Sequence, residues 1–174
     1  VGYVVRLLAL DAANRDVTIE TDIRADSLIV LADRQALRQI LINIVGNALK
    51  FSDTGSRVRI YDGVDRATSR FTLHVADAGC GIPPETLAQL GQPFVQAASD
   101  PSRNHQGTGL GVAICFGLAR AMEGALAVDS APGCGTTVSL SLQARPDARL
   151  AGSRDRADTL SGDSGIGDVV QQAG

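Results

Sequence analysis

Four short motifs constrain the fold and the function of this chain more than any other feature of its sequence. They are NIVGNALKF at residues 43–51, DAGCGI at 77–82, PF at 93–94 and GTGLG at 107–111. The motifs supply amides, a lysine, a carboxylate and glycines that let the backbone approach a ligand closely. Together they indicate a nucleotide site. No Gly-Lys-Ser or Gly-Lys-Thr occurs in the sequence, so a Walker-type phosphate loop is excluded.

The length, charge and cysteine content of the chain exclude several classes of protein. A chain of 174 residues can form one domain with its own core and some excess. The net charge is −3 and no basic run occurs, which argues against a nucleic-acid partner. The segment 1–10 is too short, and too interrupted by Arg6, to cross a membrane, so we expect no direct membrane contact. Cys80, Cys115 and Cys134 lack metal-ligand spacing and fit free thiols in a reducing compartment.

Hydrophobic periodicity and turn residues predict the elements. Asp33 is a plausible N-cap for a helix that runs to about Phe51. The other expected elements are helices over 4–13, 83–90 and 112–122, and strands over 17–22, 57–65, 70–77, 125–130 and 136–143. We expect three regions: residues 1–15 as the end of a helix or linker from a preceding domain, 16–143 as the folded domain, and 144–174 as a flexible tail or interdomain linker.

The first motif places Asn43 and Asn47 on one face of the expected helix, because residues four apart are neighbours there. An amide oxygen can complete the oxygen shell of Mg²⁺. Lys50, which continues the face, can meet a phosphate as a point charge. The alternative is a polar surface without a ligand.

The other motifs are each ambiguous when taken alone. Asp77 at a strand end can accept the exocyclic amine of adenine, but Asp-x-Gly is also an ordinary turn. The glycines of 107–111 can present N–H groups to phosphates at a helix start, or can form a hinge. A Rossmann site is rejected, because a polar loop and not a strand precedes them. His74, expected to be exposed, and His105 in the loop 96–106 are not expected to be phosphoacceptors.

The motifs resemble the N, G1, F and G2 boxes of the catalytic ATP-binding domain of sensor histidine kinases, over roughly residues 16–143. Gyrase, a heat-shock chaperone and MutL belong to the same superfamily. The resemblance implies the Bergerat ATP-binding fold, an α/β two-layer sandwich with a mixed sheet of about five strands covered on one face by helices. It implies ATP and Mg²⁺ as cofactors, with Asn47 on the metal and Asn43, Asn47 and Lys50 as the catalytic residues.

The resemblance also implies the residues that line the ATP site. They are Asn43, Asn47, Lys50, Phe51, Asp77, Gly79, Gly81, Ile82, Phe94, Gly107, Thr108, Gly109, Leu110, Gly111 and Thr136. Phe94 would anchor a lid, although 90–92 lacks the aromatic residue that usually precedes it. Asn43 stands where ATP-hydrolysing relatives have a Glu, and an amide cannot act as a general base.

The function implied by the resemblance is transfer of the ATP γ-phosphate to a histidine on the kinase's own dimerisation-phosphoacceptor hairpin. That hairpin is expected before Val1, so the isolated chain should not autophosphorylate. A response-regulator receiver domain would be the next partner. We expect a cytoplasmic bacterial protein, or the cytoplasmic part of a membrane-anchored sensor. Three alternatives remain: an anti-sigma-type serine kinase, a non-catalytic ATP-binding module of the same fold, and a gyrase-type ATPase.

Overall fold

The computed structural model describes residues 1–24, 28–92 and 109–146, and its main feature is a mixed sheet of six strands. The strands are β1 (Thr18–Asp22), β2 (Leu28–Val30), β3 (Arg57–Asp65), β4 (Arg70–Asp77), β5 (Ala125–Ser130) and β6 (Thr136–Pro146). Their order is β1-β3-β4-β6-β2, and β5 also pairs with β6. Only β1 and β3 run parallel among these pairs. The predicted mixed sheet is confirmed, with one more strand than expected.

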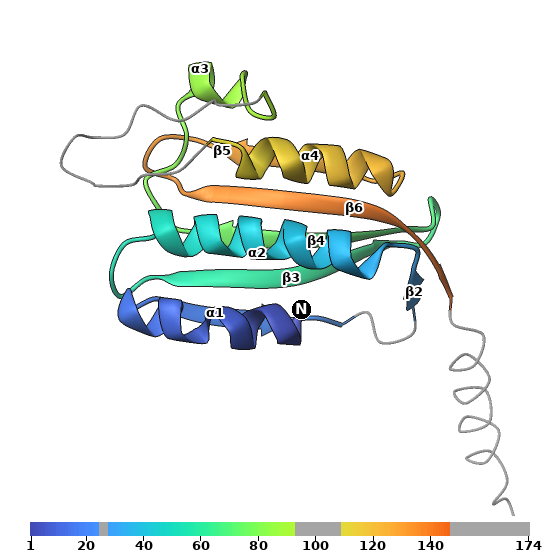
Figure 1. The fold of residues 1–174 in the computed structure, drawn as a ribbon, viewed down its shortest axis with the longest axis horizontal. Helices are drawn as coiled ribbons and strands as arrows, with labels where there is room; N and C mark the ends of the chain where they lie inside the picture. The colour runs from blue at the N-terminus through green and yellow to red at the C-terminus, as the bar shows by residue number, and fades with distance from the viewer. Residues whose placement is uncertain (25–27, 93–108, 147–174) are drawn as a thin grey trace, which may run out of the picture.

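Three helices cover one face of this sheet (Figure 1). They are α1 (Gly2–Asn14), α2 (Arg34–Phe51) and α4 (Gly111–Ala121), and a short helix α3 (Pro84–Leu87) lies apart from them. The result is the predicted two-layer α/β sandwich. The helix α2 lies between α1 and α4 in the view of Figure 1.

The core lies between α2 and the middle strands. Residues of α2 at helical spacing are buried, including Ile40 and Leu49, which are both 0% exposed. Alternate residues of β3, β4 and β6 meet them, because side chains alternate between the two faces of a strand. The buried strand residues are Val58, Ile60, Leu73, Val75, Leu140 and Leu142. The opposite face of the sheet carries polar and aromatic side chains such as Tyr61 and His74, whose rings stack with centroids 4.7 Å apart.

Helix α2 begins with the cap that the sequence predicts. Asp33 has an extended backbone, and its Oδ1 accepts a hydrogen bond of 2.7 Å from the Ala36 N–H. Asp33→Ala should therefore lower the free energy of unfolding by about 1 kcal/mol, the usual cost of losing such a cap. Urea denaturation measures this, with Asp33→Asn as the control that keeps an acceptor. Equal losses in the two variants would contradict the capping role.

Two structural features lie at the ends of the expected domain, 16–143. Helix α1 packs as part of the helical layer, with Val4 and Ala12 in the core. Strand β6 continues three residues beyond 143, where residues 144–146 pair with β2. The expected tail from 147 onward lies outside the described residues.

Candidate nucleotide-binding site

The carboxylate of Asp77 is held at the end of β4 by backbone donors. Its Oδ1 accepts hydrogen bonds from the Gly79 N–H at 2.9 Å and the Thr136 N–H at 3.2 Å. Both of these bonds go to Oδ1. The side chain is half-buried, and one of its two donors, Thr136, lies 59 residues further along the chain. This arrangement suits a carboxylate that reads the amine of a base.

The glycines beside Asp77 are required by packing within the protein. A Cβ at Gly79 would overlap the carbonyl oxygen of Phe51, and a Cβ at Gly135 would overlap that of Asp77. Gly81 lies against the carbonyl oxygen of Ala131 and has a positive φ of 71°. The end of α2, the turn after β4 and the β5–β6 turn therefore touch backbone to backbone. The sequence alone predicts that these glycines make room for a ligand, whereas in the structure they make room for the protein's own backbone.

Ser130 is a structural residue of this site that the sequence analysis missed. Its Oγ accepts from the Ile82 N–H at 2.9 Å, donates to the Gly135 carbonyl at 2.8 Å and lies 2.9 Å from Thr136 Oγ1. One hydroxyl thus ties both turns together. In the sequence it reads only as the last residue of a strand before Pro132 and Gly133, and its partners are not apparent from local pattern.

The polar face of α2, which carries Asn43, Asn47 and Lys50, contacts the start of α4 through Asn43. Asn43 Nδ2 donates to the Gly111 carbonyl at 3.4 Å, which joins the first and fourth motifs. Asn47 and Lys50 follow one and two turns later and are partly exposed. For Mg²⁺, this face offers a neutral amide oxygen, which suits a metal whose other ligands are phosphate oxygens and water. No group of three or more His, Cys, Asp or Glu that could hold a metal occurs in the described part of the chain.

Lys50, the lysine of this face, is partly buried. Burial is the main cause that lowers the pKa of Lys50, and the positive charge of Arg15 lowers it further. Its Nζ lies 5.1 Å from the centre of the Phe51 ring. A phosphate placed beside it would favour the charged ammonium, because an opposite charge stabilises the ionised form. Arg15 is the C-cap residue of α1, and no local sequence pattern connects it with Lys50.

Three predicted site residues, Phe94, Gly107 and Thr108, lie outside the described residues. The structure resumes at Gly109, which has a positive φ of 69°, and Leu110 then precedes the first residue of α4, Gly111. On the other side of the gap, Gly91 also has a positive φ and packs on the ring of Phe116, which a Cβ would approach to 2.9 Å. Phe116 of α4 thus lies beside Gly91, in the segment 90–92 that lacks the aromatic residue expected for the third motif.

The pKa of the Asp77 carboxyl is raised, chiefly by burial, and its two backbone hydrogen bonds offset part of this. Because the folded-state pKa is raised, the Asp77 carboxyl contributes its full stabilisation to the free energy of unfolding below the ordinary pKa of 3.8. This stabilisation is lost as the pH rises through the folded-state pKa. The unfolding free energy of Asp77→Asn minus that of the unchanged protein should therefore increase between about pH 4 and pH 7. Denaturation across this range checks it, and a difference that does not vary with pH would contradict it.

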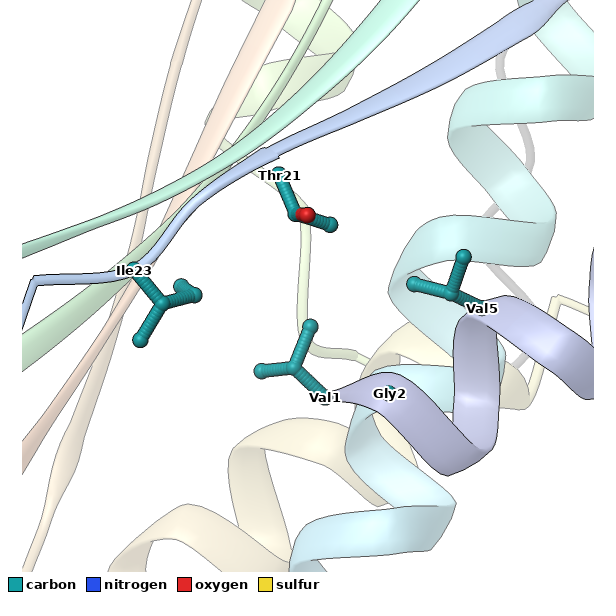
Figure 2. A pocket seen from close by; sticks show the side chains of 5 residues that line it. All are labelled: Val1, Gly2, Val5, Thr21 and Ile23. Atoms are coloured by element: carbon teal, nitrogen blue, oxygen red, sulfur yellow. The ribbon is translucent and has the colours of Figure 1, made fainter.

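Two other features lie away from the site. His74 is half-buried on the open face of the sheet, where its Nδ1 lies 2.8 Å from Ser139 Oγ, so the expectation of an exposed side chain was wrong. A cavity of about 370 Å³ lies between the start of α1 and the end of β1, as Figure 2 shows. Its lining is Val1, Gly2, Val5, Thr21 and Ile23, none of which is a predicted site residue.

No helix in the described ranges is long and apolar enough to cross a membrane.

Comparisons with known proteins agree with this geometry. The family model for "Histidine kinase-, DNA gyrase B-, and HSP90-like ATPase" matches residues 32–146. The histidine protein kinase DivJ of Caulobacter vibrioides is 39% identical over 146 residues, a match that covers 82% of this chain and 23% of DivJ. This chain thus spans less than a quarter of that relative's length.

Solved structures give the same result. Full-length ShkA in complex with AMPPNP superposes with a TM-score of 0.71 at 30% identity, over 83% of this chain and 29% of ShkA. The mycobacterial sensor histidine kinase MprB superposes with a TM-score of 0.70 at 30% identity, over 82% of this chain and 94% of the MprB chain. The chain therefore belongs to the histidine kinase-, DNA gyrase B- and HSP90-like ATPase family, as an ATP-binding catalytic domain of the sensor histidine kinase type.

Proposed function

We propose that this domain binds Mg²⁺–ATP and transfers the γ-phosphate to a histidine on a separate dimerisation hairpin of its own kinase. The observation that carries the proposal is the Asp77 carboxylate, which two backbone N–H groups orient at a glycine-lined strand end. An oriented acceptor there selects adenine, because adenine carries an exocyclic amine and guanine carries a carbonyl oxygen at the same position. Phe51, Gly79, Gly81, Ile82 and Thr136 surround this acceptor in the proposal.

The polar face of α2 would hold the phosphates. Asn47 is proposed as the protein ligand of Mg²⁺, and when bound the metal supplies neutralisation of the phosphate charge. Lys50 would contact phosphate oxygens, and Asn43 would line the same region. The N–H groups near Gly109, Leu110 and Gly111 would meet phosphates at the start of α4, where the helix dipole favours anions. Phe94, Gly107 and Thr108 are proposed to complete this side.

The same residues favour transfer over hydrolysis. Phosphoryl transfer requires mainly positioning and charge stabilisation from the protein. Hydrolysis would also need a base that takes a proton from water, and Asn43 cannot accept one at neutral pH. The accepting nucleophile would therefore come from the hairpin. We propose a response-regulator receiver domain as the subsequent partner, and a cytoplasmic location as part of a bacterial sensor.

A labelling experiment tests this function. Incubated with γ-labelled Mg²⁺–ATP, the isolated chain should remain unlabelled, because the hairpin that carries the accepting histidine is absent. Adding the dimerisation hairpin from the same reading frame should produce acid-labile phosphohistidine on the hairpin. Asn47→Ala should reduce this labelling at least about tenfold, the effect of losing a hydrogen bond or ligand to a charged group. Asn14→Ala, at the end of α1, is the matched control and should leave it unchanged.

The alternatives predict different products. Phosphate release without the hairpin would identify a gyrase-type ATPase. Acid-stable label on a protein serine would identify an anti-sigma-type kinase. Nucleotide binding with no product on any partner would identify a non-catalytic module. Acid-labile label on the lone chain that disappears in His74→Ala would contradict the proposed role of the hairpin.

A further inference from the structure

Helix α1 carries apolar side chains on two faces, and only one of these faces packs in the core. Val4 and Ala12 are buried against the rest of the domain. Tyr3, Leu7 and Leu10 are 49%, 52% and 73% exposed, and Leu10 is the most exposed large apolar side chain in the described ranges. A surface helix normally carries polar residues opposite its buried stripe. Exposed apolar side chains that lie together, unlike single ones, indicate an interaction site.

The spacing of this outer stripe, Tyr3, Leu7 and Leu10, is that of a coiled-coil seam. Intervals of four and three residues put the three side chains on one face of the helix. They match successive d, a and d positions of a heptad repeat. The Arg38 guanidinium of α2 lies 4.6 Å from the centre of the Tyr3 ring and holds the ring at this face. Figure 1 shows α1 at the edge of the helical layer, with α2 on one side only. The outer stripe is therefore open to a second helix.

The charged residues beside the outer stripe are complementary to a second copy of the same helix. In the heptad frame Arg6 takes position g and Asp11 takes position e, on opposite flanks of the stripe. When two such helices run parallel around a two-fold axis, the Arg6 flank of one copy lies against the Asp11 flank of the other. In an antiparallel pair like flanks meet, so Arg6 would lie beside Arg6 and Asp11 beside Asp11. The charges therefore favour the parallel pair.

Both charged groups are able to make this contact. Arg6 has no ion pair in the part of the chain that the structure describes. Asp11 Oδ1 lies 2.9 Å from Arg15 Nε in its own helix, and its side chain is still 43% exposed. We propose that the outer stripe of α1 pairs in parallel with the outer stripe of a second copy of this chain, with Arg6 of each copy beside Asp11 of the other.

The length of α1 sets the strength of this pair. The helix has 13 residues, which span about 20 Å, or less than two heptads. Such a short seam belongs to the weak interfaces that bury less than about 1,200 Å². Pairing of the isolated chain should therefore appear only at high protein concentration. In a kinase that dimerises through its hairpin, the tether would raise the effective concentration of the two helices. That last step rests on the proposed function, whereas pairing of the isolated chain does not.

Sedimentation of the reduced chain over a range of concentrations tests the self-association. The unchanged chain should shift reversibly from monomer to dimer, with or without nucleotide. Leu7→Ser combined with Leu10→Ser should raise the dissociation constant at least about tenfold, because both seam side chains lose their apolar burial. Val64→Ser is the matched control, since Val64 is 40% exposed on β3, and it should leave the dimer unchanged. A chain that stays monomeric at all concentrations would overturn the proposal, and protection of the stripe only by added hairpin would assign this face to the hairpin.

Charge reversal tests the parallel register. Arg6→Glu should weaken the dimer at least about threefold, because it places like charges on both flanks. Adding Asp11→Arg to the same chain should restore the affinity. Residues five apart do not face each other within one helix, so this rescue reports a contact between copies. A single variant that dimerises normally, or a double variant no tighter than the single, would overturn the paired flanks.

Disulfide cross-linking tests the orientation independently. Leu7→Cys and Leu10→Cys are made separately in a chain that carries Cys80→Ser and Cys134→Ser, and each is treated with a mild oxidant. Each variant should link to itself, because a parallel seam places identical residues at the same level. An antiparallel pair brings at most one of these positions against itself, so a link at only one of them would overturn the parallel arrangement. Val64→Cys in the same background is the control for random collision, and linking as fast as in this control would overturn the interface. None of these results depends on the nucleotide site, so failure of ATP binding and failure of this pairing are separate outcomes.

Discussion

Asp77→Asn should weaken ATP binding by about 2–4 kcal/mol, because leaving a buried polar group without its partner costs about 1–3 kcal/mol and a charged group costs more. The variant keeps an acceptor oxygen for the Gly79 and Thr136 N–H groups, so the local backbone should be retained. The substitution changes the second carboxylate oxygen, Oδ2, into an amide N–H₂. This group would face the exocyclic amine of adenine, so two hydrogen-bond donors would meet. Isothermal titration of the variant with Mg²⁺–ATP measures the loss.

The same substitution should not destabilise the protein without nucleotide. Because burial raises the pKa of Asp77, removing the charge relieves a desolvation cost, and the melting temperature should stay equal or rise. Asp129→Asn is the matched control, since Asp129 is exposed on β5, which pairs with β6 and not with β4. It should leave both ATP affinity and stability unchanged. A large loss of stability in Asp77→Asn would mean that its effect on binding reports unfolding and not recognition.

Gly135→Ala should destabilise the domain far more than Gly133→Ala. The two glycines lie in one turn with almost the same positive φ, 76° and 75°. They differ in their surroundings: a Cβ at Gly135 would overlap the Asp77 carbonyl, while a Cβ at Gly133 would meet nothing within 4 Å. The left-handed backbone alone costs about 1–2 kcal/mol for alanine. Overpacking should add about 1–3 kcal/mol at Gly135 only.

Chemical denaturation of both variants measures this difference. Because their φ angles match, subtracting the two losses isolates the packing contact with Asp77. Gly135→Ala should also weaken ATP binding, since a shift of this turn moves the Thr136 N–H that orients the carboxylate. Similar losses at the two positions would show that the turns can separate easily, contrary to the packed arrangement described above.

The elements with one buried face could be predicted closely from the sequence. The bounds of β3 and β4 coincide with the predicted 57–65 and 70–77, because alternation of apolar and polar residues directly reflects the two faces of a strand. The start of α2 followed from the chemistry of Asp33. Strand β2 was missed because it has only three residues and forms through pairing with residues 144–146, more than a hundred positions away.

Within the site, local chemistry could be predicted and tertiary contacts could not. The carboxylate at 77 and the amides on α2 follow from residue type and spacing. The reason for the glycines did not follow, because the carbonyls they approach belong to Phe51 and Ala131 in distant segments. Ser130 was missed for the same reason. His74 was misjudged because its cover comes from Tyr61 and Ser139 on the neighbouring strands.

The central claim is that this domain binds a nucleotide and selects adenine through Asp77. A comparison of its affinities for ATP and GTP tests this claim most directly. The reduced, unmodified chain is titrated with ATP and with GTP in the presence of Mg²⁺. ATP should bind at least about 30-fold more tightly, which corresponds to the lower end of the 2–4 kcal/mol expected for the Asp77 contact. Equal affinity for the two nucleotides, or no measurable binding of either, would contradict the role assigned to Asp77 and the function built on it.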